Sequence, residues 1–260
     1  MKHDPLLHQD TLYHSTNPTR RRLHRQRRNC IIRLLRSSGV GQNLPTSGLE
    51  VGPGSCTYVP TLLEICSHVT VADIEPAFLN RAKELAAHEP RLTVTTDDLT
   101  RSSLPIGHFS LILCSEVIEH IPDSAPALQG LARLLRPGGR LVLSTPQRWS
   151  AMETCARLGL APGVIQVARW VYGESVEPTG HINLLSRKQL EQQIFNAGLR
   201  ISHCQLCGFY LPLIAEFCCI FGSRWLARQE GAINKSRWSW LLWTQVYVLE
   251  RNDKTLDSFS

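Results

Sequence analysis

Two glycines and two carboxylates have the residue types and the spacing of a nucleotide site. Glu50 ends a short apolar run and is followed by Gly52 and Gly54, which can adopt backbone angles closed to other residues and let a ligand approach the main chain. Asp73 closes the next apolar run, 19 residues after Gly54. A carboxylate there can accept both hydroxyls of a ribose, so the two segments predict a nucleotide site at neighbouring strand tips. A tight turn before a helix is the simpler explanation of the glycines taken alone.

Strands and helices alternate from residue 48 onward. Helices that separate strands imply right-handed parallel crossovers, and the nearly all-apolar run 109–115 fits a central strand covered on both faces. The predicted fold is α/β: a Rossmann-like, doubly wound, mostly parallel sheet of seven strands with an antiparallel last strand, plus helical cap insertions. We expect Pro137-Gly138-Gly139 to end the helix 124–136. The expected strands are 48–52, 68–73, 92–96, 109–115, 141–144, 199–205 and 242–250, and the main helices are 57–66, 76–88, 124–136 and 186–196.

Two segments, 147–184 and 206–240, interrupt this rhythm, and we expect them to form a cap over the substrate. The first holds two expected helices, 151–159 and 163–173. The second opens with the apolar stretch 206–222, which is short for a bilayer span and which we interpret as a buried or half-buried cap helix. The alternative is a peripheral membrane contact, because tryptophan favours membrane interfaces. Four tryptophans support that alternative: Trp225, Trp238, Trp240 and Trp243.

The charge of the chain is uneven. Its formal net charge is +6, but residues 1–40 carry nine Lys/Arg against two Asp, which leaves the remainder close to neutral. We therefore divide the chain into a basic N-terminal arm and helix (1–44, helix 20–37), a ligand-binding domain (45–250) and a tail (251–260). The helix either packs its apolar end on the domain or offers its arginines to an anionic lipid or nucleic acid. Nucleic acid is the weaker of these partners, because no aromatic residues alternate with the arginines.

The cysteines indicate a reducing compartment. The chain has nine, mostly in apolar contexts, and its first ten residues are polar, with no apolar signal segment after them. We expect a cytoplasmic protein, with a peripheral membrane position as the alternative. The pair Cys204-x-x-Cys207 has no second pair at zinc-site spacing, so we expect ordinary strand cysteines and no metal.

Five segments in order resemble the motifs of class I S-adenosylmethionine-dependent methyltransferases. Glu50 to Gly54 resembles the first motif, Asp73 to Pro76 the acid after strand two, and Asp98 the acid after strand three. The segments 114–123 (CSEVIEHIPD) and 134–143 (LLRPGGRLVL) are similar to the family's sequences after strand four and before strand five. The resemblance covers about 45–205, and any one motif alone would be weak.

The chain departs from the family pattern at two positions. Cys56 stands where the third glycine is usual, and Ser110 stands where an aspartate usually follows Phe109. We expect the first change to leave a less open turn and the second to cost a structural hydrogen bond. Neither removes a carboxylate that the resemblance assigns to the cofactor.

The resemblance implies a role for each residue around S-adenosylmethionine. The main chain at Gly52, Pro53 and Gly54 would lie beside the methionine part, and Glu50 suits an amino-acid-bearing sulfonium better than a diphosphate. Asp73 would bind the ribose hydroxyls and Ile74 would pack on the adenine. Asp98, in preference to Asp97, would accept the adenine amino group, with Leu99 beside the ring. Ser115 and Glu116 would line the floor near the sulfonium.

The expected reaction is methyl transfer to a hydrophobic small molecule, such as a quinone or phenol precursor, a lipid-like intermediate or a natural product. A hydroxyl acceptor would need a base, and His120 and His181 are the candidates. A carbon or nitrogen acceptor would need neither, and both histidines could be structural. The runner-up functions are an NAD-type oxidoreductase, which Thr57 in place of a glycine disfavours, and an RNA- or membrane-associated methyltransferase. The sequence leaves the oligomeric state open.

Overall fold

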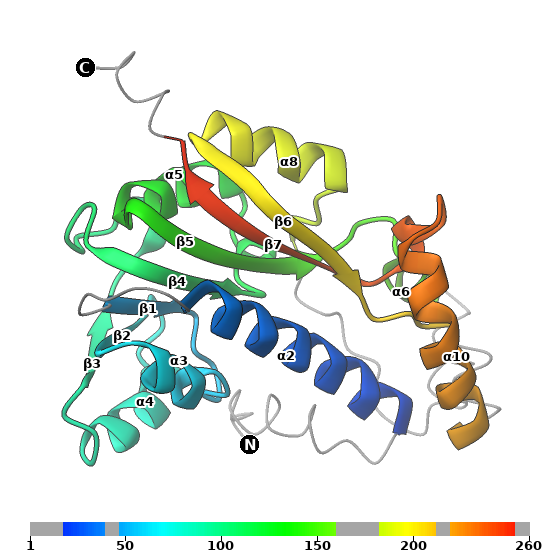
Figure 1. The fold of residues 1–260 in the computed structure, drawn as a ribbon, viewed down its shortest axis with the longest axis horizontal. Coiled ribbons are helices and arrows are strands. Elements are labelled where there is room, and N and C mark those ends of the chain that lie inside the picture. Colours follow the sequence, from blue (N-terminus) through cyan, green and yellow to red (C-terminus); the bar gives the residue numbers. More distant parts are fainter. Residues whose placement is uncertain (1–17, 40–46, 160–181, 212–218, 253–260) are drawn as a thin grey trace.

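The computed structural model describes residues 18–39, 47–159, 182–211 and 219–252 (Figure 1). Its strands are β1 Ser47–Val51, β2 His68–Asp73, β3 Leu92–Thr96, β4 Phe109–Ser115, β5 Leu135–Pro146, β6 Leu199–Cys207 and β7 Thr244–Arg251. Its α-helices are α2 Pro18–Gly39, α3 Val59–Ile65, α4 Leu79–Ala86, α5 Ser124–Leu134, α6 Ala151–Gly159, α8 Arg187–Asn196 and α10 Cys219–Asn234. Three short 3-10 helices are η1 Leu99–Arg101, η2 Ile118–His120 and η3 Ser239–Leu241.

The strands form one seven-stranded sheet in the order β3-β2-β1-β4-β5-β7-β6. The first five strands pair in parallel, and β7 pairs antiparallel with both β5 and β6. This confirms the predicted doubly wound fold with an antiparallel last strand. Because the strand order reverses between β1 and β4, the carboxyl ends of these two strands are where such folds bind ligands.

Helices cover both faces of the sheet, and each face has its own core (Figure 1). Alternate residues of β4 face opposite ways: Ile112 and Cys114 pack with α5 and α8, whereas Leu111 and Leu113 pack with α2, α3 and α4. The strand is buried almost along its whole length, as predicted for a central strand.

Helix α2 is part of the second core. Cys30, Ile31 and Leu35 are at most 1% exposed and pack with the residues of β2 and β4 on that face. The apolar end of the predicted N-terminal helix therefore lies on the domain. Residues 1–17 and 40–46 of the predicted arm lie outside the described part of the chain.

Helix α5 and strand β5 differ from their expected bounds. The helix ends at Leu134, and β5 begins at Leu135, so Pro137-Gly138-Gly139 lies within the strand instead of ending the helix. The pairing of β4 with β5 shifts register between Phe109 and Leu111, and Gly138 there has a φ of +72°. An irregular register accommodates a proline in a strand, because the missing N–H then breaks no regular ladder.

The segment 206–222 is not one cap helix, which corrects the sequence-based interpretation. Leu206 and Cys207 finish β6, Phe209 and Tyr210 are buried in a stretch without regular secondary structure, and the described helix α10 starts only at Cys219. Residues 212–218 and the expected helix 163–173 lie outside the described part. No helix in the described ranges is long and apolar enough to cross a membrane.

Ser110, which stands where the family usually has an aspartate, makes a hydrogen bond to the neighbouring strand. Its hydroxyl donates a hydrogen bond of 2.9 Å to the carbonyl oxygen of Ser47 on the neighbouring strand β1. The side chain is 3% exposed, so this bond satisfies a buried polar group. The expected loss of a structural hydrogen bond at this position is therefore wrong.

The packing of α5 on η1 leads to a stability prediction. A Cβ added at Gly130 would lie 2.4 Å from the carbonyl oxygen of Leu99, so the Gly130→Ala variant should lose about 1–3 kcal/mol of unfolding free energy in urea denaturation. Gly231→Ala on α10 is the matched control: no atom lies within 4 Å of its added Cβ. The control should gain about 0.4–1 kcal/mol, because alanine costs less backbone entropy. A Gly130→Ala protein as stable as the parent would contradict the close approach of α5 to η1.

Candidate active site

The tip of β1 holds a buried carboxyl group. Glu50 pairs in register with Val71 of β2 and Leu113 of β4, both in the core under α2, α3 and α4, so its side chain lies on that face. It is 2% exposed, and its Oε2 atom has no hydrogen-bond partner among the described residues. Burial raises the pKa of Glu50 to about 8. A buried carboxyl oxygen without a partner is costly and suits a cationic ligand group.

The bend after β1 needs residues that tolerate left-handed backbone angles. Gly52 has a φ of +69°, and a Cβ there would lie 2.4 Å from a methyl carbon of Val117. Gly54 and Cys56 follow with φ of +49° and +58°. The position where the family usually has its third glycine is therefore left-handed here too, and Cys56 holds it at a cost of about 1 kcal/mol. The Cys56 side chain is buried in the core, which offsets part of that strain.

The tip of β2 presents a carboxylate beside an exposed apolar residue. The Oδ1 atom of Asp73 accepts a hydrogen bond of 2.8 Å from the Glu75 N–H. Burial raises the pKa of Asp73, although backbone hydrogen bonds act against that shift. Ile74 is 64% exposed, which leaves it available to pack on a ligand.

The two acids after β3 have local partners. Asp98 caps η1 by accepting from the N–H and hydroxyl of Thr100, at 2.9 and 2.7 Å, and these bonds lower its pKa. Asp97 accepts from the N–H of Ser103 at 2.8 Å. Leu99 is buried in the core, so only its edge could reach a ring. A cavity of about 100 Å³ between η1 and α5 is lined by Leu99 but by no other predicted cofactor residue, so it is not the nucleoside site.

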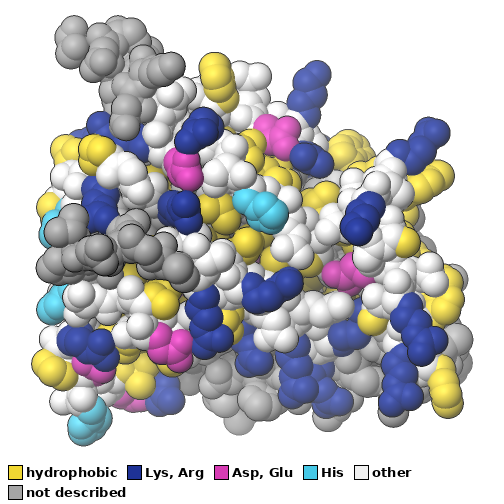
Figure 2. Space-filling model, viewed as in Figure 1, with side chains coloured by type: hydrophobic (Ala, Val, Ile, Leu, Met, Phe, Trp, Pro, Cys, Tyr) yellow, Lys and Arg dark blue, Asp and Glu magenta, His cyan; other side chains and the backbone are white. Residues whose placement is uncertain are grey.

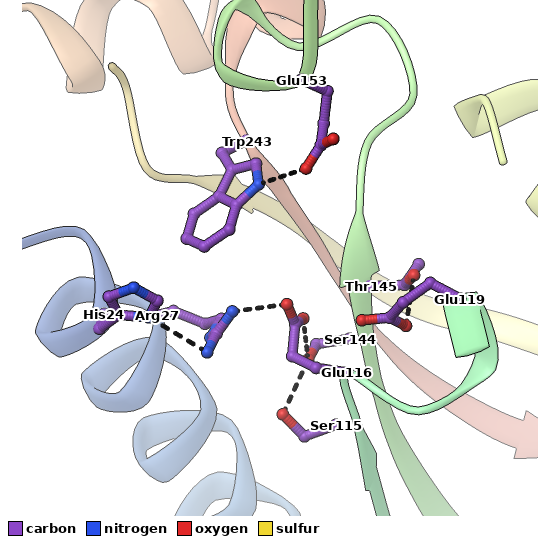
Figure 3. A network of polar contacts seen from close by, with 9 residues as sticks. All are labelled: His24, Arg27, Ser115, Glu116, Glu119, Ser144, Thr145, Glu153 and Trp243. Atoms are coloured by element: carbon purple, nitrogen blue, oxygen red, sulfur yellow. Dashed lines mark hydrogen bonds and ion pairs between the residues drawn. The ribbon is translucent and has the colours of Figure 1, made fainter. Parts of the chain in front are cut away.

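A hydrogen-bonded network occupies the tip of β4 (Figure 3). Glu116 has a φ of +55°, unusual for a residue other than glycine. Its Oε1 atom accepts from the Ser144 hydroxyl at 2.9 Å, and that hydroxyl lies 3.0 Å from the hydroxyl of Ser115. Strained backbone held by several contacts is typical of functional sites.

The cation of this network comes from α2, and the sequence did not reveal it. Arg27 donates from Nη1 to Glu116 Oε2 at 2.5 Å and lies 5.2 Å from the ring centre of Trp243 (Figure 3). His24 packs edge-on against the same ring, which donates from Nε1 to Glu153 at 3.1 Å. Trp243 is thus 6% exposed, which corrects its interpretation as an interfacial tryptophan. No pattern in the sequence separates Arg27 from its neighbouring arginines.

A second buried carboxyl follows β4. Glu119 is fully buried; its Oε2 accepts from the Thr145 hydroxyl at 2.9 Å, and its Oε1 has no partner in the described part of the chain. Burial and, to a lesser extent, the Glu116 carboxylate raise its pKa well above the usual range. The Glu119 carbonyl accepts from the N–H groups of Ile182 and Asn183, each at 3.0 Å. Glu119 was not among the site residues predicted from the sequence.

Of the two candidate bases, His120 lies in the described part of the chain. His120 ends η2 and is exposed. His181 lies outside the described residues, but its neighbour Ile182 is hydrogen-bonded to Glu119, next to His120. The role of either histidine as a base stays a prediction.

The pair Arg27–Glu116 should contribute measurably to stability. Its side chains are 10% and 16% exposed, so Arg27→Met leaves a poorly hydrated carboxylate without its cation. In a double-mutant cycle with Glu116→Gln, measured by urea denaturation, we expect a coupling of about 1–3 kcal/mol. Arg25→Met, at an exposed position of the same helix, is the control and should change stability by less than about 0.5 kcal/mol. Additive single-variant effects would show that the pair contributes nothing.

The raised pKa of Glu50 predicts a pH-dependent stability. Between the usual pKa of 4.5 and about 8, folded Glu50 keeps a proton that the unfolded chain releases, so stability falls as pH rises through this window. Glu50→Gln cannot titrate, so its stability relative to the parent should rise by roughly 2–3 kcal/mol from about pH 5.5 to 7.5. Urea denaturation at both pH values measures the difference, with the exposed Glu75→Gln as control. Parallel profiles for Glu50→Gln and the parent would mean that folded Glu50 ionises normally.

Comparison with known proteins places these strand tips in context. A protein-family model described as "Methyltransferase domain" matches residues 21–203. The chain is similar to a ubiquinone biosynthesis O-methyltransferase of Xylella fastidiosa (strain 9a5c), with 32% identity over 128 residues, or 46% of this chain and 51% of that protein. The chain therefore matches only about half the length of such curated relatives.

Two solved structures share the fold. One is the N-methyltransferase NodS from Bradyrhizobium japonicum WM9 in complex with S-adenosylhomocysteine, with a TM-score of 0.58, 18% identity and coverage of 96% of this chain and 95% of that one. The other is geranyl diphosphate C-methyltransferase from Streptomyces coelicolor A3(2), with a TM-score of 0.54, 13% identity and coverage of 86% and 77%. Because the family match runs from α2 into β6 and includes all five motif segments, the chain belongs to the class I S-adenosylmethionine-dependent methyltransferases, and S-adenosylmethionine is its cofactor.

Proposed function

We propose that this protein transfers a methyl group from S-adenosylmethionine to a hydrophobic small molecule. The observation that carries the proposal is the buried Glu50 oxygen without a described partner, beside the left-handed bend at Gly52. A ligand with an amino acid's ammonium group would supply the missing partner, and the bend lets such a ligand lie against the main chain. A dinucleotide carries no such ammonium group, and its diphosphate would place negative charge beside the carboxyl.

The other predicted contacts fit the same cofactor. Asp73 would accept the ribose hydroxyls, and the exposed face of Ile74 would pack on the adenine. Asp98 would accept the adenine amino group while Thr100 holds its Oδ1 atom. When bound, S-adenosylmethionine supplies a methyl group on a sulfonium that is already a good leaving group.

The residues of this chain would act mainly by aligning the acceptor with the methyl group, which can lower a reaction barrier by several kcal/mol. Arg27 and Ser144 hold the Glu116 carboxylate at the tip of β4. In this fixed position, the carboxylate would orient an acceptor. If the acceptor is a hydroxyl, as the name of the O-methyltransferase relatives favours, His120 or His181 would take its proton.

The acceptor class rests on the apolar part of the described cap. A third buried cluster is apolar and includes Leu206, Phe209, Tyr210 and Leu226, together with Leu23 of α2 and Trp243, the residue directly before β7. The indole ring of Trp243 also contacts Arg27. This apolar cluster therefore adjoins the polar network at β4. The matched relatives are named for ubiquinone biosynthesis, and one structural neighbour is named for geranyl diphosphate, a molecule with an apolar prenyl chain. We propose the segments 147–184 and 206–240 as the enclosure of the acceptor.

The cofactor site can be tested by calorimetric titration. The parent protein should bind S-adenosylhomocysteine and not NAD, and Asp73→Ala should weaken that binding by about 1–3 kcal/mol, the scale of losing hydrogen bonds to a charged acceptor. Glu75→Ala removes a neighbouring exposed carboxylate and should leave the dissociation constant unchanged.

Transfer itself is tested with labelled S-adenosylmethionine and a set of prenylated phenols, with short water-soluble phenols for comparison. Label should pass preferentially to the prenylated acceptors, and it should fail to do so in Asp73→Ala at low cofactor concentration. Tight binding of NAD alone would refute the methyltransferase, and transfer only to the soluble phenols would refute the apolar acceptor.

A further inference from the structure

Helix α10 has two unlike faces. On the inner face, Leu226 is fully buried, and Glu230 and Ile233 follow it at helical spacing. Away from this face, Phe221 is 81% exposed and Trp225 47% exposed, one turn apart. Large aromatic side chains in water on the outer side of a well-anchored helix indicate a surface that some partner covers.

The charge on this outer side has one sign. Between residues 219 and 243 the cations are Arg224, Arg228, Lys235 and Arg237, and all four are exposed. Glu230, the one acidic residue in that stretch of sequence, points inward and accepts from the N–H groups of Gly208 and Phe209 at 3.1 and 3.2 Å. Within residues 219–243, the four cations are therefore exposed, whereas the carboxylate of Glu230 is engaged by the backbone of Gly208 and Phe209.

The exposed aromatics continue past the helix. Trp238 and Trp240, at the start and within η3, are 53% and 44% exposed, and their ring centres lie 6.2 Å apart. The Arg237 guanidinium lies 5.9 Å from the Trp238 ring centre. We call the set of Phe221, Trp225, Trp238, Trp240 and the four cations the α10 face. In Figures 1 and 2, α10 forms one side of the molecule, where Lys/Arg and hydrophobic side chains stand next to each other.

We propose that the α10 face docks this protein on an anionic lipid bilayer, with the helix lying along the interface. Tryptophan and phenylalanine gain most at the level of lipid headgroups, and arginine and lysine can lower their stems into that layer while their charges meet lipid phosphates. Each such cation adds to the attraction of an anionic leaflet. A nucleic acid backbone would also neutralise the cations, and its bases could stack on the aromatic rings, so the test below includes single-stranded RNA. The proposal deepens the proposed function, because a bilayer concentrates apolar acceptors, but it does not depend on methyl transfer.

The test is flotation of the full chain with vesicles of phosphatidylcholine, with and without about 30% phosphatidylglycerol. The parent should float only with the anionic vesicles, and its tryptophan emission should shift to the blue. Phe221→Ser/Trp225→Ser and Arg224→Gln/Arg228→Gln should each lower binding by at least about tenfold. The control, Arg81→Gln/Lys83→Gln, removes two exposed cations from α4 and should bind as the parent does.

Binding of S-adenosylhomocysteine by every variant shows that it is folded, and this readout separates the docking surface from the cofactor site. Equal binding to both kinds of vesicle, an equal loss in the α4 control, or flotation without a tryptophan shift would overturn the proposal. The proposal would also be overturned if the parent bound single-stranded RNA more tightly than anionic vesicles and lost that binding in the two double variants of α10.

Discussion

A carboxyl group in a dry interior is the constraint on which this structure depends. Glu50 sits on the central strand β1, between two fully buried apolar neighbours and under a layer of three helices, and its Oε2 atom has no described partner. Such a group destabilises the fold at neutral pH unless it is protonated or meets a cation. The fold keeps it at the point where the strand order reverses, which is where folds of this kind bind ligands. We infer that the methyl donor's ammonium group resolves the conflict.

Strained backbone and a part-buried ion pair also lie at the carboxyl ends of β1 and β4. Cys56 and Glu116, the two residues other than glycine with positive φ in the described chain, follow β1 and β4 respectively. Val117 fills the space that a side chain at Gly52 would need, so the two bends are packed against each other. The ion pair of Arg27 with Glu116 links the second bend to α2, so the basic N-terminal helix adjoins the candidate site and is also part of the core. Backbone strain of this kind persists only where surrounding contacts determine it.

Much of the fold follows from the sequence because its signals are local. The strands 68–73, 92–96 and 109–115 have their predicted bounds, and α8, which a capping box of Ser186 and Gln189 opens, coincides with the expected helix 186–196. The carboxylates at the strand tips were equally predictable, since they sit at fixed distances from glycine and apolar runs. Contacts between distant segments were not: Arg27 is one of several arginines on α2, and Trp243 differs from Trp240 only in what the fold places against it. The prediction of one cap helix over 206–222 was wrong because composition does not distinguish an apolar strand end from an apolar helix.

The most direct measurement is a crystal structure of the protein with S-adenosylhomocysteine. The account predicts that the ligand's ammonium group lies within hydrogen-bond distance of Glu50, with its ribose hydroxyls on Asp73. Clear density for the ligand with Glu50 still lacking a partner, or with the nucleoside away from the tips of β1 and β2, would contradict it.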